Sequence, residues 1–282
     1  MILGISSFAY GWSVGIGENT PSHPMSEIDL VKSTFTHELH CLQIGDNLPL
    51  HTFSEDRLNT FKVDLEKNNI RLEIGARKLT ADHFQRYIEL SSFFNSPLLR
   101  FVIDGDDYEP NLHTITALLH SFVPELEKRK ITLGIENHDR FRAKDLANIM
   151  RAIDSKHVGI CLDCVNSMGA GEGLEYVVDI LAPYAVNLHI KDFKVERLWH
   201  KMGFTIMGAP AGKGLSNIPM ILEKLKPYNR CESAVLEQWV PLDVNIEEVC
   251  KKERDWVSIG IQYLKRLPDF NASQQSKLKQ IT

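Results

Sequence analysis

The sequence predicts a single (β/α)8 barrel, on three observations. The chain has 282 residues, close to the roughly 250 that such a barrel needs. Short apolar runs alternate eight times with segments of helical periodicity, and no shift in composition marks a second domain. Ionisable residues follow each of the last four apolar runs. An open, doubly wound sheet stays as the alternative, because counting strands from one sequence is error-prone.

The first half of the chain predicts four strands and four helices. The strands are the apolar runs at residues 2–6, 42–45, 71–76 and 98–103. Ser26 and Ser54 are typical N-caps and open the first two helices. The third helix covers residues 80–95, and the fourth begins at Asn111. Pro124 lies inside the fourth helix and is expected to kink or split it.

The second half repeats this plan. Its strands are predicted at residues 131–135, 158–162, 185–190 and 234–237. Its helices are predicted at residues 143–153 and 172–181, from Ser216 onward, and at 245–267. An insertion at residues 191–214 precedes the helix at Ser216. We therefore expect a barrel domain at 1–267 and a polar, flexible tail at 268–282.

Composition narrows the class of protein. The net charge is −5 without a long basic run, which argues against nucleic acid as the main partner. No apolar run approaches the roughly 20 residues of a membrane span, and the N-terminus lacks the basic start of a signal peptide. Five cysteines without regular spacing suit a reducing compartment. We expect a cytoplasmic protein with no membrane partner, and a homodimer or homotetramer is compatible with the sequence.

The residues that end the last four strands predict a metal site. They are Glu136, Asp163, His189 and Glu237. In a barrel all carboxyl ends face one mouth, so these residues can share one ion. Three carboxylates and an imidazole suit a divalent cation, with Mn²⁺ preferred and Mg²⁺, Co²⁺ or Zn²⁺ as alternatives. One strand-end carboxylate alone is as often a helix cap or a salt-bridge partner, but four residues in succession are a stronger signal.

The segments IENHDRF, CLDCVNS, NLHIKDF and AVLEQW resemble the sugar phosphate isomerase/epimerase family, a xylose isomerase-like group of TIM barrels that includes the endonuclease IV type. The resemblance spans nearly the whole chain. It implies that Glu136, Asp163, His189 and Glu237 bind one divalent metal, and that the two glutamates are the catalytic acid–base pair. Many epimerases of the family have a histidine where this chain has Asn166, so their substrate preference does not carry over.

Other residues near these strand ends are expected to bind substrate or to orient the ligands. The predicted substrate-binding residues are Arg100, His138, Arg197, His200 and Trp12. For Arg100 the alternative is a salt bridge across the mouth. Arg197 and His200 lie in the 191–214 insertion, which is interpreted as a lid over the mouth or, alternatively, as an exposed loop that packs by its aromatic residues. The residues expected to orient the ligands by hydrogen bonds are Asn137, Asn166 and Asp192.

Two further motifs are set aside. Cys161 and Cys164 form a CxxC without a second pair, and they lie on opposite faces of a strand, which argues against a zinc or redox site. The segment GAPAGKG at 208–214 lacks the spacing of a phosphate loop. We interpret it as a turn whose backbone N–H groups can touch an anionic substrate.

Four functions are weighed. The leading hypothesis is a metal-dependent isomerase or epimerase of a ketose, in which the metal stabilises an enediolate while carboxylates move the proton. The second is a decarboxylase or dehydratase of an oxo sugar acid, favoured by the cationic residues Arg197, His200, Lys201 and Arg140. An apurinic endonuclease is disfavoured by the acidic charge and by the lack of histidines at the ends of strands two to four. A barrel that only binds sugar is disfavoured because both glutamates are retained.

Overall fold

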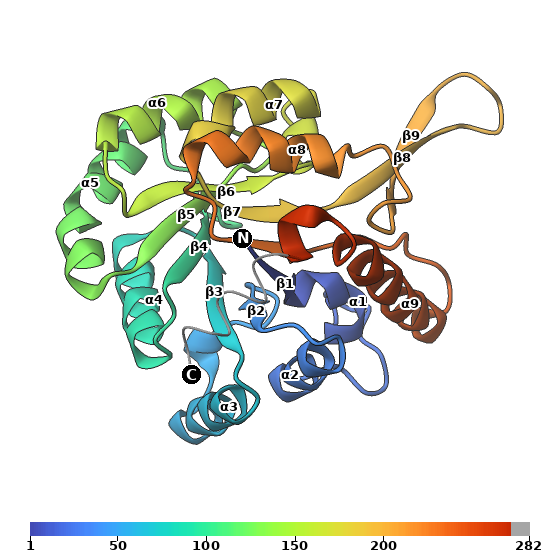
Figure 1. Ribbon diagram of the computed structural model, residues 1–282, viewed down its shortest axis with the longest axis horizontal. Helices are drawn as coiled ribbons and strands as arrows, with labels where there is room; N and C mark the ends of the chain where they lie inside the picture. The colour runs from blue at the N-terminus through green and yellow to red at the C-terminus, as the bar shows by residue number, and fades with distance from the viewer. Residues whose placement is uncertain (272–282) are drawn as a thin grey trace.

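A closed barrel of parallel strands forms the centre of the molecule (Figure 1), in a computed structural model that describes residues 1–271. The order around the barrel is β1-β10-β7-β6-β5-β4-β3-β2. The strands are β1 (Ile2–Ser6), β2 (Cys41–Ile44), β3 (Arg71–Arg77), β4 (Leu98–Val102), β5 (Thr132–Glu136), β6 (Val158–Asp163), β7 (Ala185–Ile190) and β10 (Ser233–Leu236). The prediction of a (β/α)8 barrel is thereby confirmed, and the open sheet is excluded because β1 pairs with both β10 and β2.

Helices surround the barrel on its outside (Figure 1). They are α2 (Glu27–Thr36), α3 (Glu55–Lys67), α4 (Ala81–Phe93), α5 (Leu112–Arg129), α6 (Ala143–Ile153), α7 (Leu174–Leu181), α8 (Ile218–Leu225) and α9 (Ile246–Leu264). A short helix α1 (Gly11–Val14) follows β1, and single 3-10 turns cover Ser7–Tyr10, Leu50–Thr52, Asn166–Met168, Ala182–Tyr184 and Lys226–Tyr228. Ser26 and Ser54 accept backbone N–H bonds as N-caps, as predicted. None of the helices within residues 1–271 is long and apolar enough to cross a membrane.

Pro124 was expected to kink or split its helix. The split is wrong, because α5 is one helix from Leu112 to Arg129. A proline inside a helix removes one hydrogen bond and costs about 3 kcal/mol. Here the buried residues Ile115 and Leu119 precede Pro124, and Leu126 follows it. Packing on both sides of the proline holds the helix together, since most helical stability in proteins comes from such burial.

The insertion forms a hairpin rather than a lid. Strands β8 (Asp192–Arg197) and β9 (Phe204–Ala209) pair antiparallel from Asp192↔Ala209 to Arg197↔Phe204. Six extended residues span about 20 Å, and Figure 1 shows the hairpin projecting away from the barrel. Its end is open to solvent, with Trp199 91% exposed. The interpretation of this segment as a lid over its own barrel mouth is therefore wrong, because the paired strands carry the end outward.

The C-terminal part of the described chain lies against the barrel. Phe270 is buried in the main apolar core, and Asp269 pairs with Lys226 at 3.1 Å. Both residues fall within the predicted tail at 268–282. The remainder of that tail, residues 272–282, lies outside the described residues, so its predicted flexibility stays a prediction.

Candidate metal centre

The four strand-end residues converge on one buried point inside the barrel mouth. The imidazole Nδ1 of His189 lies 3.3 Å from Oε2 of Glu237. The same nitrogen lies 3.5 Å from Oε2 of Glu136 and 3.8 Å from Oδ2 of Asp163. All four residues are at most 2% exposed. They come from the ends of β5, β6, β7 and β10, which are adjacent in the barrel, so the strand order itself assembles the cluster.

The tautomer of His189 is set by Gln43 on β2. Oε1 of Gln43 lies 2.7 Å from Nε2 of His189. The amide of Gln43 is oriented by its own donors, which bond Glu73 and Asn187 at 3.2 Å each. An amide oxygen can only accept, so Nε2 carries the proton and Nδ1 presents a lone pair. That lone pair faces the carboxylates of Glu136, Asp163 and Glu237, an arrangement that fits a cation between them.

Within residues 1–271, Nδ1 of His189 has no hydrogen-bond partner, and Oδ2 of Asp163 has only its ion pair with Lys191. Buried polar atoms are normally bonded, and a metal ligand is one of the few reasons for an exception. Burial disfavours a charged imidazole, but the charges of Glu237 and Glu136 outweigh burial and raise the pKa of His189. A proton on Nδ1 and a metal at Nδ1 are therefore alternatives for the same position. The residues fit a divalent metal.

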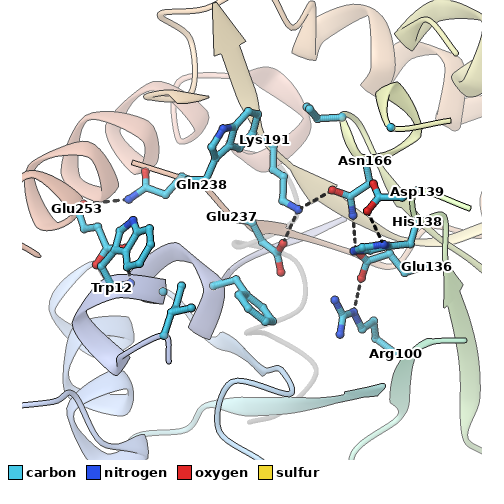
Figure 2. Close-up of a pocket in the computed structure, with 16 residues that line it drawn as sticks. Trp12, Arg100, Glu136, His138, Asp139, Asn166, Lys191, Glu237, Gln238 and Glu253 are labelled. Carbon is cyan, nitrogen blue, oxygen red and sulfur yellow. Dashed lines mark hydrogen bonds and ion pairs between the residues drawn. The ribbon is translucent and has the colours of Figure 1, made fainter. Parts of the chain in front are cut away.

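Lys191 carries its ammonium group into the same cluster. Its Nζ lies 2.7 Å from Oδ2 of Asp163 and 3.1 Å from Oε2 of Glu237, contacts that are partly visible in Figure 2. Burial opposes the charge of Lys191, but these carboxylates outweigh burial and raise its pKa. The three cluster carboxylates and one ammonium leave two negative charges. With neutral His189, one divalent ion balances that charge.

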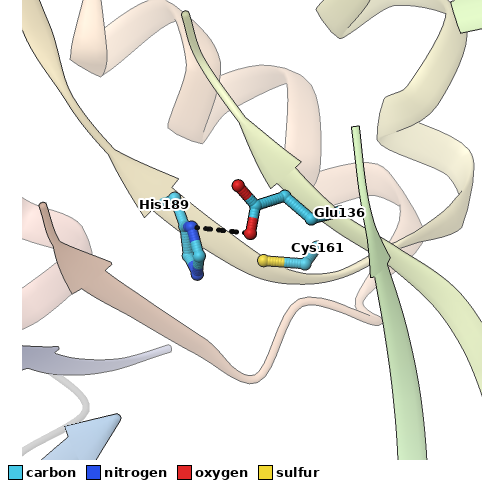
Figure 3. Close-up of side chains that lie close together, drawn as sticks. All are labelled: Glu136, Cys161 and His189. Carbon is cyan, nitrogen blue, oxygen red and sulfur yellow. Dashed lines mark ion pairs between the residues drawn. The ribbon is translucent and has the colours of Figure 1, made fainter. Parts of the chain in front are cut away.

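Cys161 lies beside Glu136 and His189 (Figure 3), and the candidate ligand atoms of the three residues lie within 4.8 Å of one another. Its thiol donates to Oδ1 of Asn187 at 3.0 Å. Burial, reinforced by the nearby charge of Glu136, raises the pKa of this thiol well above its usual value. Since only the thiolate binds metal well, Cys161 is a poor ligand compared with Asp163.

Three polar side chains orient the predicted ligands. Asn137 accepts from the backbone N–H of Asp163 at 2.7 Å and donates to its carbonyl at 2.9 Å. Asn166 donates to Oε1 of Glu136 at 2.7 Å. The hydroxyl of Ser6 donates to Oε1 of Glu237 at 2.7 Å. Each bond fixes one carboxylate group or its backbone, as expected for residues that support a metal site.

A cavity of about 380 Å³ opens from this cluster to solvent, a volume that suits a small polar molecule. Figure 2 shows Glu136 and Glu237 pointing into it from opposite sides of Lys191. Trp12 and His138 also line it, so the structure brings these two predicted residues to the site. Further lining residues are Phe8, Ile16, Asn166, Gln238 and Trp239.

Arg100 lines the cavity too, but its guanidinium is engaged. It forms an ion pair with Glu136 and another with Asp46 at 2.8 Å. Burial opposes its charge, yet Glu136 and Asp46 outweigh burial and raise its pKa well above the usual value. The geometry matches the salt bridge that was weighed as the alternative for Arg100.

The structure does not bring Arg197 and His200 to this cavity. Both are exposed at the far end of the β8–β9 hairpin, where Arg197 packs over the ring of Phe204 at 4.2 Å. The pairing of β8 with β9 carries both residues outward, so their role as substrate ligands stays a prediction.

The carboxylate of Asp192 binds backbone N–H groups instead of orienting a metal ligand. Its carboxylate accepts from the backbone N–H groups of Phe193, Gly212, Gly214 and Ser216 at 2.8 to 2.9 Å. The turn at 208–214 therefore surrounds an anion, but that anion is the protein's own carboxylate. The expectation that this turn touches an anionic substrate is wrong for Gly212 and Gly214, whose N–H groups are taken.

Lys191 and Gln43 were missed in the sequence. Side chains of a strand alternate between its two faces, and His189 faces the barrel interior. Lys191 stands two positions later and therefore follows the same face. Gln43 is a polar residue within a buried strand, where an unpaired amide is costly. Both signals are visible in the sequence once the inward face is known.

Comparison with known proteins agrees with this geometry. Residues 41–267 match a family model described as xylose isomerase-like TIM barrel. A 3-oxo-isoapionate decarboxylase of Pectobacterium atrosepticum is 29% identical over 264 residues, which cover 94% of this chain and 95% of that protein.

Two solved structures share the fold at low identity. A xylose isomerase-like TIM barrel protein from Mycobacterium smegmatis, in complex with magnesium, has a TM-score of 0.67 and 13% identity, with 92% of this chain and 96% of that one covered. A D-psicose 3-epimerase, in the presence of D-fructose, has a TM-score of 0.69 and 12% identity, with 94% and 98% covered.

Proposed function

The chain belongs to the xylose isomerase-like TIM barrel family, and we propose that it is a divalent-metal-dependent decarboxylase of an oxo sugar acid. This hypothesis ranked second on the sequence alone. The similarity to a decarboxylase over nearly the full length of both chains supports it over the isomerase. Within the proposal, Glu136, Asp163, His189 and Glu237 hold the metal, with Mn²⁺ preferred.

One structural observation carries the proposal. Lys191 presents an ammonium group inside the cavity, next to the predicted metal ligands Asp163 and Glu237. A neutral ketose has no need of a buried cation, whereas an oxo acid brings a carboxylate that does. The lysine side chain is long and flexible, so its ammonium has the reach to turn from Glu237 to a substrate carboxylate in the same cavity.

The reaction breaks one carbon–carbon bond. In a 3-oxo acid the bond between the carboxyl carbon and C2 is cleaved, and its electron pair moves between C2 and C3 as the C3 oxygen takes the negative charge. CO2 leaves, and C2 then takes a proton from solvent. When bound, the divalent ion would supply the positive charge that stabilises the oxygen at C3.

The chain's own residues hold the reacting groups in place. Gln43 fixes the proton of neutral His189 on Nε2, and Ser6 fixes one oxygen of Glu237. Trp12 is held at the cavity wall because its indole N–H donates to the carbonyl of Val240 at 2.8 Å.

An isomerase or epimerase of a keto sugar is the second candidate. It is favoured by Glu136 and Glu237, which point into one cavity from β5 and from the end of β10 (Figure 2). Two carboxylates so placed can remove a proton beside a carbonyl and return it from the other side.

The two candidates are separated by one assay. Metal-loaded protein is incubated in D2O with 3-oxo-isoapionate and, separately, with a panel of ketoses, and both are followed by ¹³C and ¹H NMR. Release of one CO2 per molecule of acid supports the decarboxylase. Deuterium entering a ketose without CO2 release supports the isomerase instead, and turnover of neither class by metal-loaded protein contradicts both.

A further inference from the structure

The β8–β9 hairpin has two unlike faces. Residues that pair directly across an antiparallel ladder point to the same side, so the pairs Val195↔Ile206 and Arg197↔Phe204 share one face. The pairs Lys194↔Met207 and Glu196↔Thr205 share the other. The first face is largely apolar and yet exposed, with Phe204 60% open to solvent.

The turn that ends the hairpin adds more exposed apolar surface. Trp199 is 91% and Met202 86% exposed, although the turn itself is well formed. The N–H of Leu198 donates to the carbonyl of Gly203 at 3.1 Å, and that of Lys201 donates to the carbonyl of Leu198 at 2.8 Å. An ordered, projecting apolar surface is typical of a protein contact. We define the hairpin end as residues 195–206.

The rim of the barrel mouth offers a matching surface. The loops after β1 and β10 expose apolar side chains, namely Ile16, Leu242 and Val244. The same rim carries the exposed acids Glu18, Asp139 and Asp243. The hairpin end carries the exposed basic residues Arg197, His200 and Lys201, while its one acid, Glu196, is paired with Lys194. The apolar side chains of the hairpin end match those of the rim, and its basic residues are complementary in charge to the acids of the rim.

We propose that the hairpin end of one copy of this chain docks on the barrel mouth of a second copy. The hairpin begins at the carboxyl end of β7, on the same rim that it would contact. Two copies related by a two-fold axis can therefore exchange hairpins reciprocally, each covering the other's mouth. The second copy's Arg197 and His200 then reach the cavity entrance, where a contact with a substrate carboxylate rests on the proposed function. The docking itself does not rest on the proposed function.

Cross-linking tests the placement. A benzophenone amino acid replaces Trp199, and protein labelled with ¹⁵N is mixed with unlabelled protein before irradiation. Cross-linked peptides that combine both labels and contain Ile16 or residues 239–245 are the expected result. Mixed-label products on another face, cross-links confined to one copy, or no cross-link at all each overturn the proposal.

The mass in solution provides a second test that needs no substrate. We expect light scattering to give a multiple of the 32.1 kDa chain. The double variant Trp199→Glu, Met202→Glu should reduce this mass to that of one chain. The control is Val63→Glu on α3, a similarly exposed apolar residue, which should keep the assembly. A monomeric parent protein, or a double variant that stays assembled, overturns the proposal even if the decarboxylase assay succeeds.

Discussion

Oε1 of Gln43 lies 2.7 Å from Nε2 of His189, across the barrel from β2 to β7. This bond holds the proton on Nε2 and leaves Nδ1 for a metal. Gln43→Leu removes the acceptor, and we expect metal affinity to fall by about 10- to 100-fold. Titration calorimetry with Mn²⁺ measures the change.

A loss of affinity in Gln43→Leu has to be distinguished from general damage to the core. Thr34→Val is the control, because Thr34 is similarly buried and its hydroxyl donates to the carbonyl of Leu30 within α2. We expect this variant to bind Mn²⁺ like the parent. Parent-like affinity in Gln43→Leu would show that the tautomer does not depend on Gln43.

Lys191→Met should tighten metal binding. The ammonium group of Lys191 and a metal share Asp163 and Glu237 as partners, so removing the lysine removes a competitor. We expect Mn²⁺ to bind at least about tenfold more tightly, about 1.4 kcal/mol. The metal-free variant should be less stable by about 3–5 kcal/mol, because buried carboxylates lose their counter-ion.

Thermal unfolding with and without Mn²⁺, together with calorimetry, checks both parts. Lys191→Arg keeps the charge and should stay close to the parent in affinity. If the decarboxylase proposal is right, Lys191→Met also loses turnover despite its tighter metal binding. Weaker Mn²⁺ binding in Lys191→Met would mean that the lysine supports the metal site instead of competing for it.

The sequence predicts the barrel because its signals are local. Apolar runs and helical stripes each need only one element, and N-caps such as Ser26 need only four residues. The convergence of Glu136, Asp163, His189 and Glu237 also follows from the sequence, since any parallel barrel brings strand ends to one rim.

The predictions fail for residues whose partners are distant in the sequence. They also fail where strand pairing within the insertion determines which way the side chains lie. Asp192 is predicted to support the metal, yet three of its four backbone partners lie 20 to 24 residues later in a turn. Arg197 and His200 looked like lid residues, but antiparallel pairing within the insertion directs them outward. Lys191 was passed over because its neighbours Asp163 and Glu237 come from other strands.

Asp192→Asn should damage stability and spare the metal. The carboxylate accepts four backbone N–H bonds. In asparagine one of these two acceptor oxygens is replaced by an NH2 donor. That donor then faces backbone N–H groups, either those of Gly212 and Gly214 or that of Ser216. We expect a loss of about 2–4 kcal/mol, which lowers the Tm by roughly 3–7 °C in a chain of this length. Calorimetry and elemental analysis measure the two quantities.

Asp255→Asn, an exposed change on α9, should leave both the Tm and the metal content unchanged. If Asp192→Asn instead keeps its Tm and loses its metal, then Asp192 supports the metal site after all.

Glu237→Gln separates the two candidate reactions. Burial alone would keep this carboxyl neutral, but His189 and Lys191 outweigh burial and lower its pKa well below the usual range. Glu237 is therefore ionised at neutral pH and can accept a proton. An isomerase needs such a base, so Glu237→Gln should then reduce kcat by about 10²- to 10⁴-fold. Loss of CO2 needs no base, so a decarboxylase should suffer only from the loss of a metal ligand.

Asp163→Asn is the matched control, because it removes a ligand of the same kind from a residue that does not line the cavity. Both variants are assayed at Mn²⁺ concentrations that saturate them. For a decarboxylase we expect the two variants to lose a similar share of kcat, because each change affects only the metal site and no proton transfer. A much greater loss in Glu237→Gln than in Asp163→Asn would assign the proton transfer to Glu237 and move the function to the isomerase, because only that reaction takes a proton from the substrate carbon.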